Sequence, residues 1–85
     1  MSRDPLPCLS SLAQTIVVGG FYEHYKGPQY KVIGIARHSE TLEELVVYLD
    51  QYGITWVRPL EIFTSEITID GQTRPRFKWK AESGN

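Results

Sequence analysis

The chain has only one cysteine, Cys8. A single thiol cannot close an intramolecular disulfide, and it cannot supply the several cysteines of a structural zinc site. The core alone must therefore stabilise the fold, as is usual in the reducing cytoplasm. A glycine-rich phosphate loop is also lacking, because the pairs Gly19-Gly20 and Lys26-Gly27 are too sparse to form one. We predict no cofactor.

Long apolar runs are absent as well. No stretch approaches the roughly 20 apolar residues that a membrane-spanning helix needs. The segment from Met1 to Val18 carries one arginine followed by an aspartate and two prolines, and it lacks the unbroken apolar core of a signal peptide. We therefore expect a cytoplasmic protein with no membrane partner.

The chain also lacks an excess of positive or negative charge. The formal net charge of the 85 residues is −1, so binding to nucleic acid or to an anionic membrane would need a local basic patch. Hydrophobic residues make up 41% of the chain and charged residues 22%, which is ordinary for a globular protein. A chain of this length forms one small domain, monomeric or weakly dimeric, without a large internal cavity.

The distribution of proline and glycine divides the chain into three parts. Pro5 and Pro7 remove backbone donors and favour extended neighbours, so we predict a loosely ordered N-terminal arm over residues 1–18. Leu12 to Ile16 fits either a helical turn or the lead-in to a strand. Residues 19–80 then form the domain, and residues 81–85 form a flexible tail.

The first half of the domain has the pattern of β-strands. Phe21 to Tyr25 alternates as a short strand, Lys26 to Gln29 supplies turn residues, and Tyr30 to His38 is rich in β-branched residues. Strict alternation in the second strand predicts one face made of the following residues: Tyr30, Val32, Gly34 and Ala36. Both faces carry apolar groups, which indicates a central strand.

Thr41 to Gly53 fits two structures. A capping box of Thr41 and Glu44, with leucines at helical spacing, favours a helix. The β-branched and aromatic residues within Leu45 to Leu49 favour a strand that follows a hairpin connection. Periodicity alone slightly favours the helix.

The last third of the domain predicts a short strand, a helical turn and a hairpin. Thr55 to Arg58 is a strand halted by Pro59, which suits the first position of a helical turn. Glu66 to Ile69 and Thr73 to Lys80 flank an Asp-Gly turn signal. In this hairpin Ile67 and Ile69 would share a face with Phe77 and Trp79, and Glu66 would lie near the basic residues of the last strand. Pro75 marks an edge strand.

These elements predict a mainly β fold, a small, partly open five-stranded barrel of the SH3-like kind, with one helical turn before the last hairpin.

Several motifs resemble a bacterial family, the domain of unknown function 1653. In chain order they are His24-Tyr25-Lys26-Gly27, Tyr30-x-Val32, Ala36-Arg37-His38-Ser39-Glu40-Thr41, Val46-Val47-Tyr48, Trp56-Val57-Arg58-Pro59 and Arg76-Phe77. The resemblance covers about residues 20 to 77 and implies a β-rich domain in which Leu45 to Leu49 is a strand. Residues 1–19 lie outside it, and the connection from Leu49 to Thr55 is shorter than is usual in the family. The family brings no known substrate or catalytic residue.

An enzyme that uses His24 or His38 as a general acid–base is the weakest of three hypotheses, because the domain is small and no catalytic motif is present. In Arg37-His38-Ser39-Glu40 neighbouring side chains would point to opposite faces of a strand, so they do not form a catalytic triad. The spacing of His24, His38 and Glu40 matches no standard metal site, and we predict no metal and no catalytic residue.

A binding site for an anionic ligand or an acidic protein partner is the preferred interpretation. Polar and aromatic side chains gather near the predicted turns at one mouth of the barrel. The predicted ligand-binding residues are His24, Tyr25, Arg37, His38, Glu40, Trp56 and Arg58. Two alternatives stay open: Tyr30, Tyr48 and Trp56 fill the core, and the two arginines pair with Glu40 or Glu61.

Nucleic-acid binding is the second hypothesis. Basic and aromatic residues alternate in the last strand, a pattern that combines phosphate contacts with base stacking. The residues that would carry it are Arg74, Arg76, Lys78 and Lys80. The competing interpretation is a solvated face paired with carboxylates on the neighbouring strand.

Overall fold

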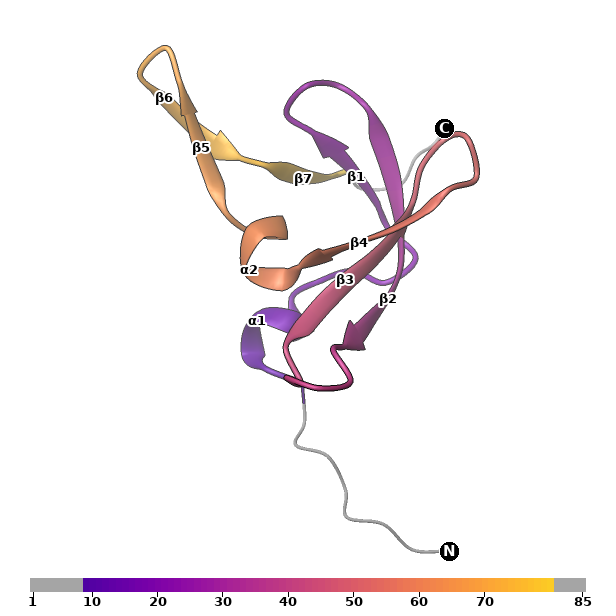
Figure 1. The fold of residues 1–85 in the computed structure, drawn as a ribbon. Helices are drawn as coiled ribbons and strands as arrows, with labels where there is room; N and C mark the ends of the chain where they lie inside the picture. The colour runs from indigo at the N-terminus through magenta and orange to yellow at the C-terminus, as the bar shows by residue number, and fades with distance from the viewer. Residues whose placement is uncertain (1–8, 81–85) are drawn as a thin grey trace, which may run out of the picture.

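A computed structural model describes residues 9–80 and confirms the mainly β prediction (Figure 1). Within these residues there are seven strands in two antiparallel sheets and two single-turn helices. The elements are α1 (Ser11–Gln14), β1 (Phe21–His24), β2 (Gln29–Arg37), β3 (Glu44–Leu49), β4 (Thr55–Pro59), α2 (Leu60–Phe63), β5 (Glu66–Ile69), β6 (Gln72–Pro75) and β7 (Phe77–Lys80). The helical turn before the last hairpin is α2, as predicted.

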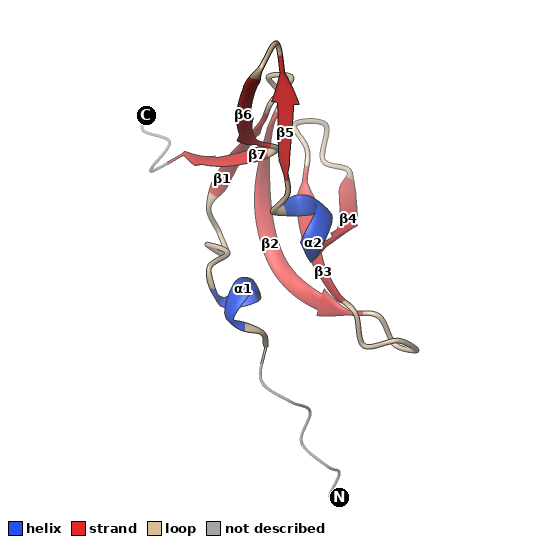
Figure 2. Ribbon diagram, turned by 90° about the vertical axis from the view of Figure 1, so that its left-hand side faces the viewer, coloured by secondary structure: helices blue, strands red, loops and turns tan. Residues whose placement is uncertain are grey.

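Five strands form one sheet in the order β4-β3-β2-β1-β7. The strands β5 and β6 form a separate hairpin that extends away from this sheet (Figure 1). The strand β2 is long and curved, and α2 lies beside β3 and β4 (Figure 2). The described strands do not close into a barrel, and the SH3-like assignment stays a prediction. No helix of the described part is long and apolar enough to cross a membrane.

The strand interpretation of Leu45 to Leu49 is confirmed. β3 pairs with β2 on one side and β4 on the other, and its Val46 and Tyr48 are buried. Pairing on both sides outweighs the local helical spacing, because it satisfies the backbone and buries alternate side chains together. The connection before β3 is a tight turn in which Leu42 adopts a φ of 64°.

The predicted alternation in β2 is wrong beyond Val32. The register opposite β3 slips between Val32 and Gly34, and Ile33 is the extra residue of a β-bulge. An inserted residue moves every later side chain to the other face. Ile35 and Arg37 therefore share a face with Val32.

The prediction of one continuous strand from Thr73 to Lys80 is also wrong. β6 pairs with β5, whereas β7 pairs with β1, and Arg76 separates them. Proline at position 75 has no N–H for a ladder. The Arg76 N–H donates to the Ser65 carbonyl oxygen (2.9 Å), and the Tyr25 N–H donates to the Arg76 carbonyl oxygen (2.9 Å). Arg76 thus joins the hairpin to the sheet.

The core lies on one face of the five-stranded sheet, which we call the inner face. Its buried side chains include Tyr22, Val32, Val46, Tyr48, Phe63 and Phe77. Phe63 of α2 stacks on Phe77 with a centroid distance of 4.2 Å and an interplanar angle of 10°. Phe77 therefore faces the core as predicted, but Trp79 is 48% exposed, and Ile67 and Ile69 belong to the separate hairpin.

The described part of the predicted arm, residues 9–18, contains α1. Ser10 caps this turn by accepting a hydrogen bond from the Ala13 N–H on its hydroxyl oxygen (3.1 Å), and Ala13 is buried in the core. Leu9 and Ile16 pack against the same core. The rest of the predicted arm and the predicted tail, residues 1–8 and 81–85, lie outside the described residues.

Candidate functional site

Six of the seven predicted ligand-binding residues fall into two groups at opposite ends of β2. His24 and Tyr25 lie where β1 enters its turn to β2, and Trp56 lies opposite Tyr48 near the same end. The other group lies at the far end of β2, where Arg37 is the last residue of the strand and His38 and Glu40 follow it. A nine-residue strand is about 30 Å long. The structure therefore does not gather all seven at one mouth.

Arg58 projects from β4 onto the inner face. Its Nε donates a hydrogen bond to the Tyr48 hydroxyl (3.2 Å), and its guanidinium carbon lies 5.4 Å from the centroid of the Phe77 ring. Among the described residues, none accepts a hydrogen bond from Nη1 or Nη2 of Arg58. The side chain is thus held at one edge and over one ring, and the outer edge of its planar fork is available to a ligand.

A hollow of about 180 Å³ adjoins this guanidinium, lined by Tyr30, Tyr48, Trp56 and Arg58. The core alternative is right for Tyr48, which is 4% exposed, whereas Trp56 is 49% exposed. Tyr30 is half-buried and meets the Tyr48 ring edge-on at 5.1 Å. Aromatic side chains therefore surround the cation without filling the space above it.

Asp50 fixes the indole of Trp56 at the rim of the hollow. One carboxylate oxygen accepts a hydrogen bond from Trp56 Nε1 (2.8 Å), and the other accepts from the N–H groups of Tyr52 (2.8 Å) and Ile54 (2.9 Å). The bond from Trp56 is the largest cause that lowers the pKa of Asp50 below its usual value, so the carboxylate stays charged. The sequence reasoning missed Asp50, although an aspartate three residues before a turn glycine, Gly53, indicates such a turn.

The two histidines stabilise turns. His24 Nδ1 accepts a hydrogen bond from the Lys26 N–H (3.1 Å), and His38 Nδ1 accepts from the N–H groups of Glu40 (3.1 Å) and Thr41 (3.3 Å). Because the rings lie at opposite ends of β2, they cannot share a metal ion, and residues 9–80 contain no cluster of three metal-ligating side chains.

The surroundings of His24 lower the pKa of its ring. Its ring lies 4.9 Å from Phe77. Burial lowers the pKa of His24, and the positive charges of Arg58, Arg76 and Lys26 lower it further. Three positively charged side chains thus lie close enough to His24 to act on its ring.

A second hollow, of about 370 Å³, has His24 in its lining. Residues of the predicted ligand-binding set and of the predicted nucleic-acid set line this hollow together with two neighbours: Glu23, His24, Tyr25, Arg74, Pro75 and Lys78. Lys80 forms an ion pair with Glu23 of the neighbouring strand β1 (3.4 Å). A basic residue of the last strand therefore does pair with a carboxylate across the sheet, but the carboxylate is that of Glu23. The predicted partner, Glu66, lies opposite Pro75 in the separate hairpin. Arg76 turns away and donates from Nε to the Ser65 hydroxyl (2.9 Å).

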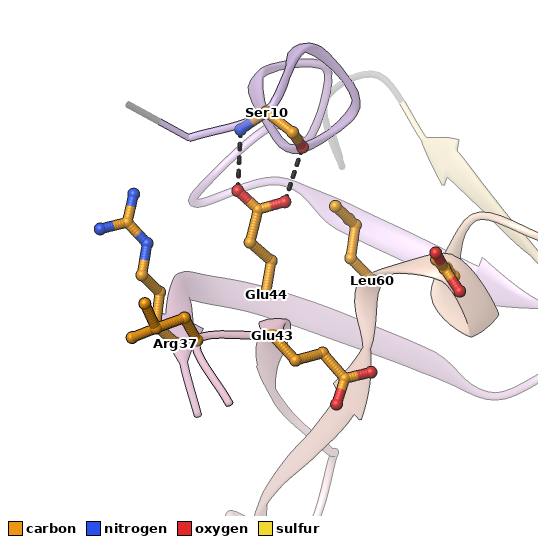
Figure 3. Close-up of a pocket in the computed structure, with 7 residues that line it drawn as sticks. Ser10, Arg37, Glu43, Glu44 and Leu60 are labelled. Carbon is orange, nitrogen blue, oxygen red and sulfur yellow. Dashed lines mark hydrogen bonds between the residues drawn. The ribbon is translucent and has the colours of Figure 1, made fainter. Parts of the chain in front are cut away.

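At the far end of β2, Arg37 lies in a hollow of about 340 Å³ between α1 and α2 (Figure 3). The Glu44 carboxylate accepts hydrogen bonds from the Ser10 N–H (2.7 Å) and the Ser10 hydroxyl (2.6 Å), which join α1 to β3. These bonds are the main cause of a lowered pKa at Glu44, and the positive charge of Arg37 adds to it. The charge of Arg37 thus acts on Glu44, which was not among its predicted partners.

Acid is expected to release α1 from β3. Since folding lowers the pKa of Glu44, its stabilising effect is present above the unfolded pKa and is lost as pH falls through the folded pKa. The NMR signal of the Ala13 amide, which donates to Ser10, should shift with a midpoint below the usual glutamate pKa. Glu44→Gln should abolish this titration, whereas Glu43→Gln, at the exposed neighbour, should keep it. An unchanged titration in the Glu44 variant would contradict the assignment.

The comparisons with known proteins agree with the fold. The family model described as "Protein of unknown function (DUF1653)" matches residues 20–79. The chain belongs to the DUF1653 family. A solved structure, described as the crystal structure of a protein belonging to DUF1653 from Bordetella bronchiseptica, is similar with 31% identity and a TM-score of 0.75. The match covers 86% of this chain and 97% of that one. No curated protein matches the sequence.

Proposed function

We propose that this DUF1653 protein is a binding module that recognises an anionic group through Arg58 on the inner face of its sheet. The observation that carries the proposal is the geometry of Arg58, whose Nε is held by the Tyr48 hydroxyl and whose side chain lines a hollow. Two parallel hydrogen bonds from a guanidinium fit a carboxylate or a phosphate.

Two features of the surroundings strengthen this site for an anion. Contact with the Phe77 ring and the Tyr48 hydroxyl fixes the arginine before a ligand arrives, so less side-chain entropy is lost on binding. The positive charges of Arg76 and Lys26 act on His24 together with that of Arg58, and after burial they contribute to its lowered pKa. Both features favour a negative ligand over a neutral one.

The test is an NMR titration of isotope-labelled protein with acetate, succinate and inorganic phosphate. We expect saturable shifts at the side chain of Arg58 and at the indole of Trp56, and at least tenfold weaker binding in Arg58→Gln. Lys31→Gln is the matched control, because it removes one positive charge from an exposed position whose backbone lies opposite Leu49 in the same sheet. Equal affinities in the Arg58 variant and the wild type would overturn the proposal, as would the absence of saturable shifts with all three anions.

Nucleic-acid binding is a second candidate, favoured by the larger hollow that brings Tyr25 together with Arg74 and Lys78. Aromatic and basic groups in one groove suit a single strand. For a single-stranded oligonucleotide, each lost phosphate contact lowers the slope of log affinity against log salt by about 0.7. The double variant Arg74→Gln and Lys78→Gln should therefore lower the slope by about 1.4. A flat salt response of the wild type would exclude this candidate.

A further inference from the structure

The strand β4 leaves part of its backbone open at the edge of the five-stranded sheet. The Asp50 N–H donates to the carbonyl oxygen of Ile54 (2.9 Å) and closes the β3–β4 hairpin. Because hydrogen-bonded pairs alternate along an antiparallel ladder, the bonded pairs of β4 are those of Trp56 and Arg58. The N–H and C=O groups of Thr55 and Val57 therefore point away from β3, toward the open edge.

The side chains along this edge suit a partner strand. Trp56 is 49% exposed on the inner face, and Val57 is 57% exposed on the outer face. At the other edge, β7 carries Lys78 and Lys80, and edge lysines are a common protection against strand addition. Pro59 has no N–H and ends the open edge of β4, so the edge accommodates one short segment.

We propose that β4 accepts an extended acidic peptide as an additional antiparallel strand, with an acidic side chain bound by Arg58. This inference rests on the proposed anion site and names its partner class. Peptide residues opposite Trp56 and Arg58 lie on the inner face, where carboxylates meet the guanidinium. Those opposite Thr55 and Val57 lie on the outer face, where apolar side chains pack on Val57.

Charge distinguishes this partner from a second copy of the chain. β4 itself, Thr55–Pro59, contains no carboxylate, so a second β4 would not place a carboxylate opposite Arg58. The nearby positive charges of Arg76 and Lys26 also favour an acidic strand. Backbone hydrogen bonds would then provide affinity, and the alternating acidic and apolar side chains would provide specificity.

The test uses the peptide acetyl-Val-Glu-Val-Glu-Val-amide and two N-methylated forms. A methyl group on the nitrogen of the central valine removes the N–H that faces Val57, whereas a methyl group on the nitrogen of the second glutamate alters an N–H that faces solvent. We expect the first methylation to weaken binding at least tenfold and the second to change it less than threefold. Bound peptide should also slow hydrogen exchange of the Thr55 and Val57 amides.

The outcomes separate this inference from the proposed function. Arg58-dependent binding that is insensitive to both methylations would overturn strand addition and leave the anion site standing. Small anions bound at Arg58 with no peptide binding would do the same. A peptide with lysine in place of glutamate that bound equally well would remove the charge argument. Dimerisation of the protein at peptide-free millimolar concentration, with protection of the Val57 amide, would assign the edge to a second copy instead.

Discussion

Phe63→Ala is expected to remove a large part of the free energy of unfolding of the domain. Phe63 is 1% exposed and touches three other rings: Phe77 at 4.2 Å, Tyr22 at 5.3 Å and Tyr48 at 5.8 Å between centroids. Removing a buried phenylalanine ring typically costs about 3–5 kcal/mol, against a total stability of about 5–15 kcal/mol for a domain. Leu60 is the other buried side chain of α2, and it has no ring that could replace the stacking on Phe77.

Thermal unfolding followed by circular dichroism measures this effect. At roughly 4–8 °C per kcal/mol for a domain of this size, the midpoint should fall by at least about 12 °C. Ile62→Ala is the matched control on the same helical turn, because Ile62 is 44% exposed, and it should cost about 1 kcal/mol. Equal losses in the two variants would show that α2 is not anchored by the ring of Phe63.

Local signals were sufficient for most of the strands and for α2. Turn residues such as Gly27 and Gly71, with φ values of 114° and 79°, lie where the sequence places its turns. The bulge in β2 also had a signal, because a glycine inside a strand, here Gly34, often marks one. Strict alternation ignored that signal and assigned Ile35 to the wrong face.

The partner of the last strand could not be predicted from local signals. The Asp-Gly turn correctly predicts that β5 meets β6, but it says nothing about the chain after Pro75. Whether β7 continues along β5 or pairs with β1 depends on contacts between residues far apart in sequence. These long-range contacts include the stacking of Phe77 on Phe63 and the backbone hydrogen bonds that join Arg76 to Ser65 and Tyr25.

The binding roles of Arg58 and Trp56 stay a prediction from residue type. The structure places both side chains in the lining of one hollow. The predicted site combined residues from the turns before and after β2, and these turns lie at opposite ends of that strand, so Arg37 and His38 are separated from Trp56. A histidine that caps a turn looks the same in sequence as one that binds a ligand.

Tyr48→Ala is expected to remove both stability and anion binding. The side chain is 4% exposed, packs on Tyr30, Phe63 and Phe77, and accepts the hydrogen bond that holds Arg58. By comparison with other buried aromatic residues, its loss should cost about 3–5 kcal/mol. Thermal unfolding should show this directly, and anions should no longer bind at the remaining folded protein because Arg58 loses its anchor.

Tyr48→Phe separates the two roles of this side chain. The ring stays, so the unfolding midpoint should fall by far less than in the alanine variant, while the hydroxyl that fixes Arg58 Nε is gone. Without this hydrogen bond, the Arg58 side chain is mobile before binding and loses more conformational entropy when an anion binds. We therefore expect the affinity for anions to fall several-fold. Tyr52→Phe is the control, since Tyr52 is 78% exposed and its hydroxyl forms no hydrogen bond with another residue of the range 9–80. Unchanged affinity in Tyr48→Phe would mean that packing against Phe77 alone is enough to position Arg58.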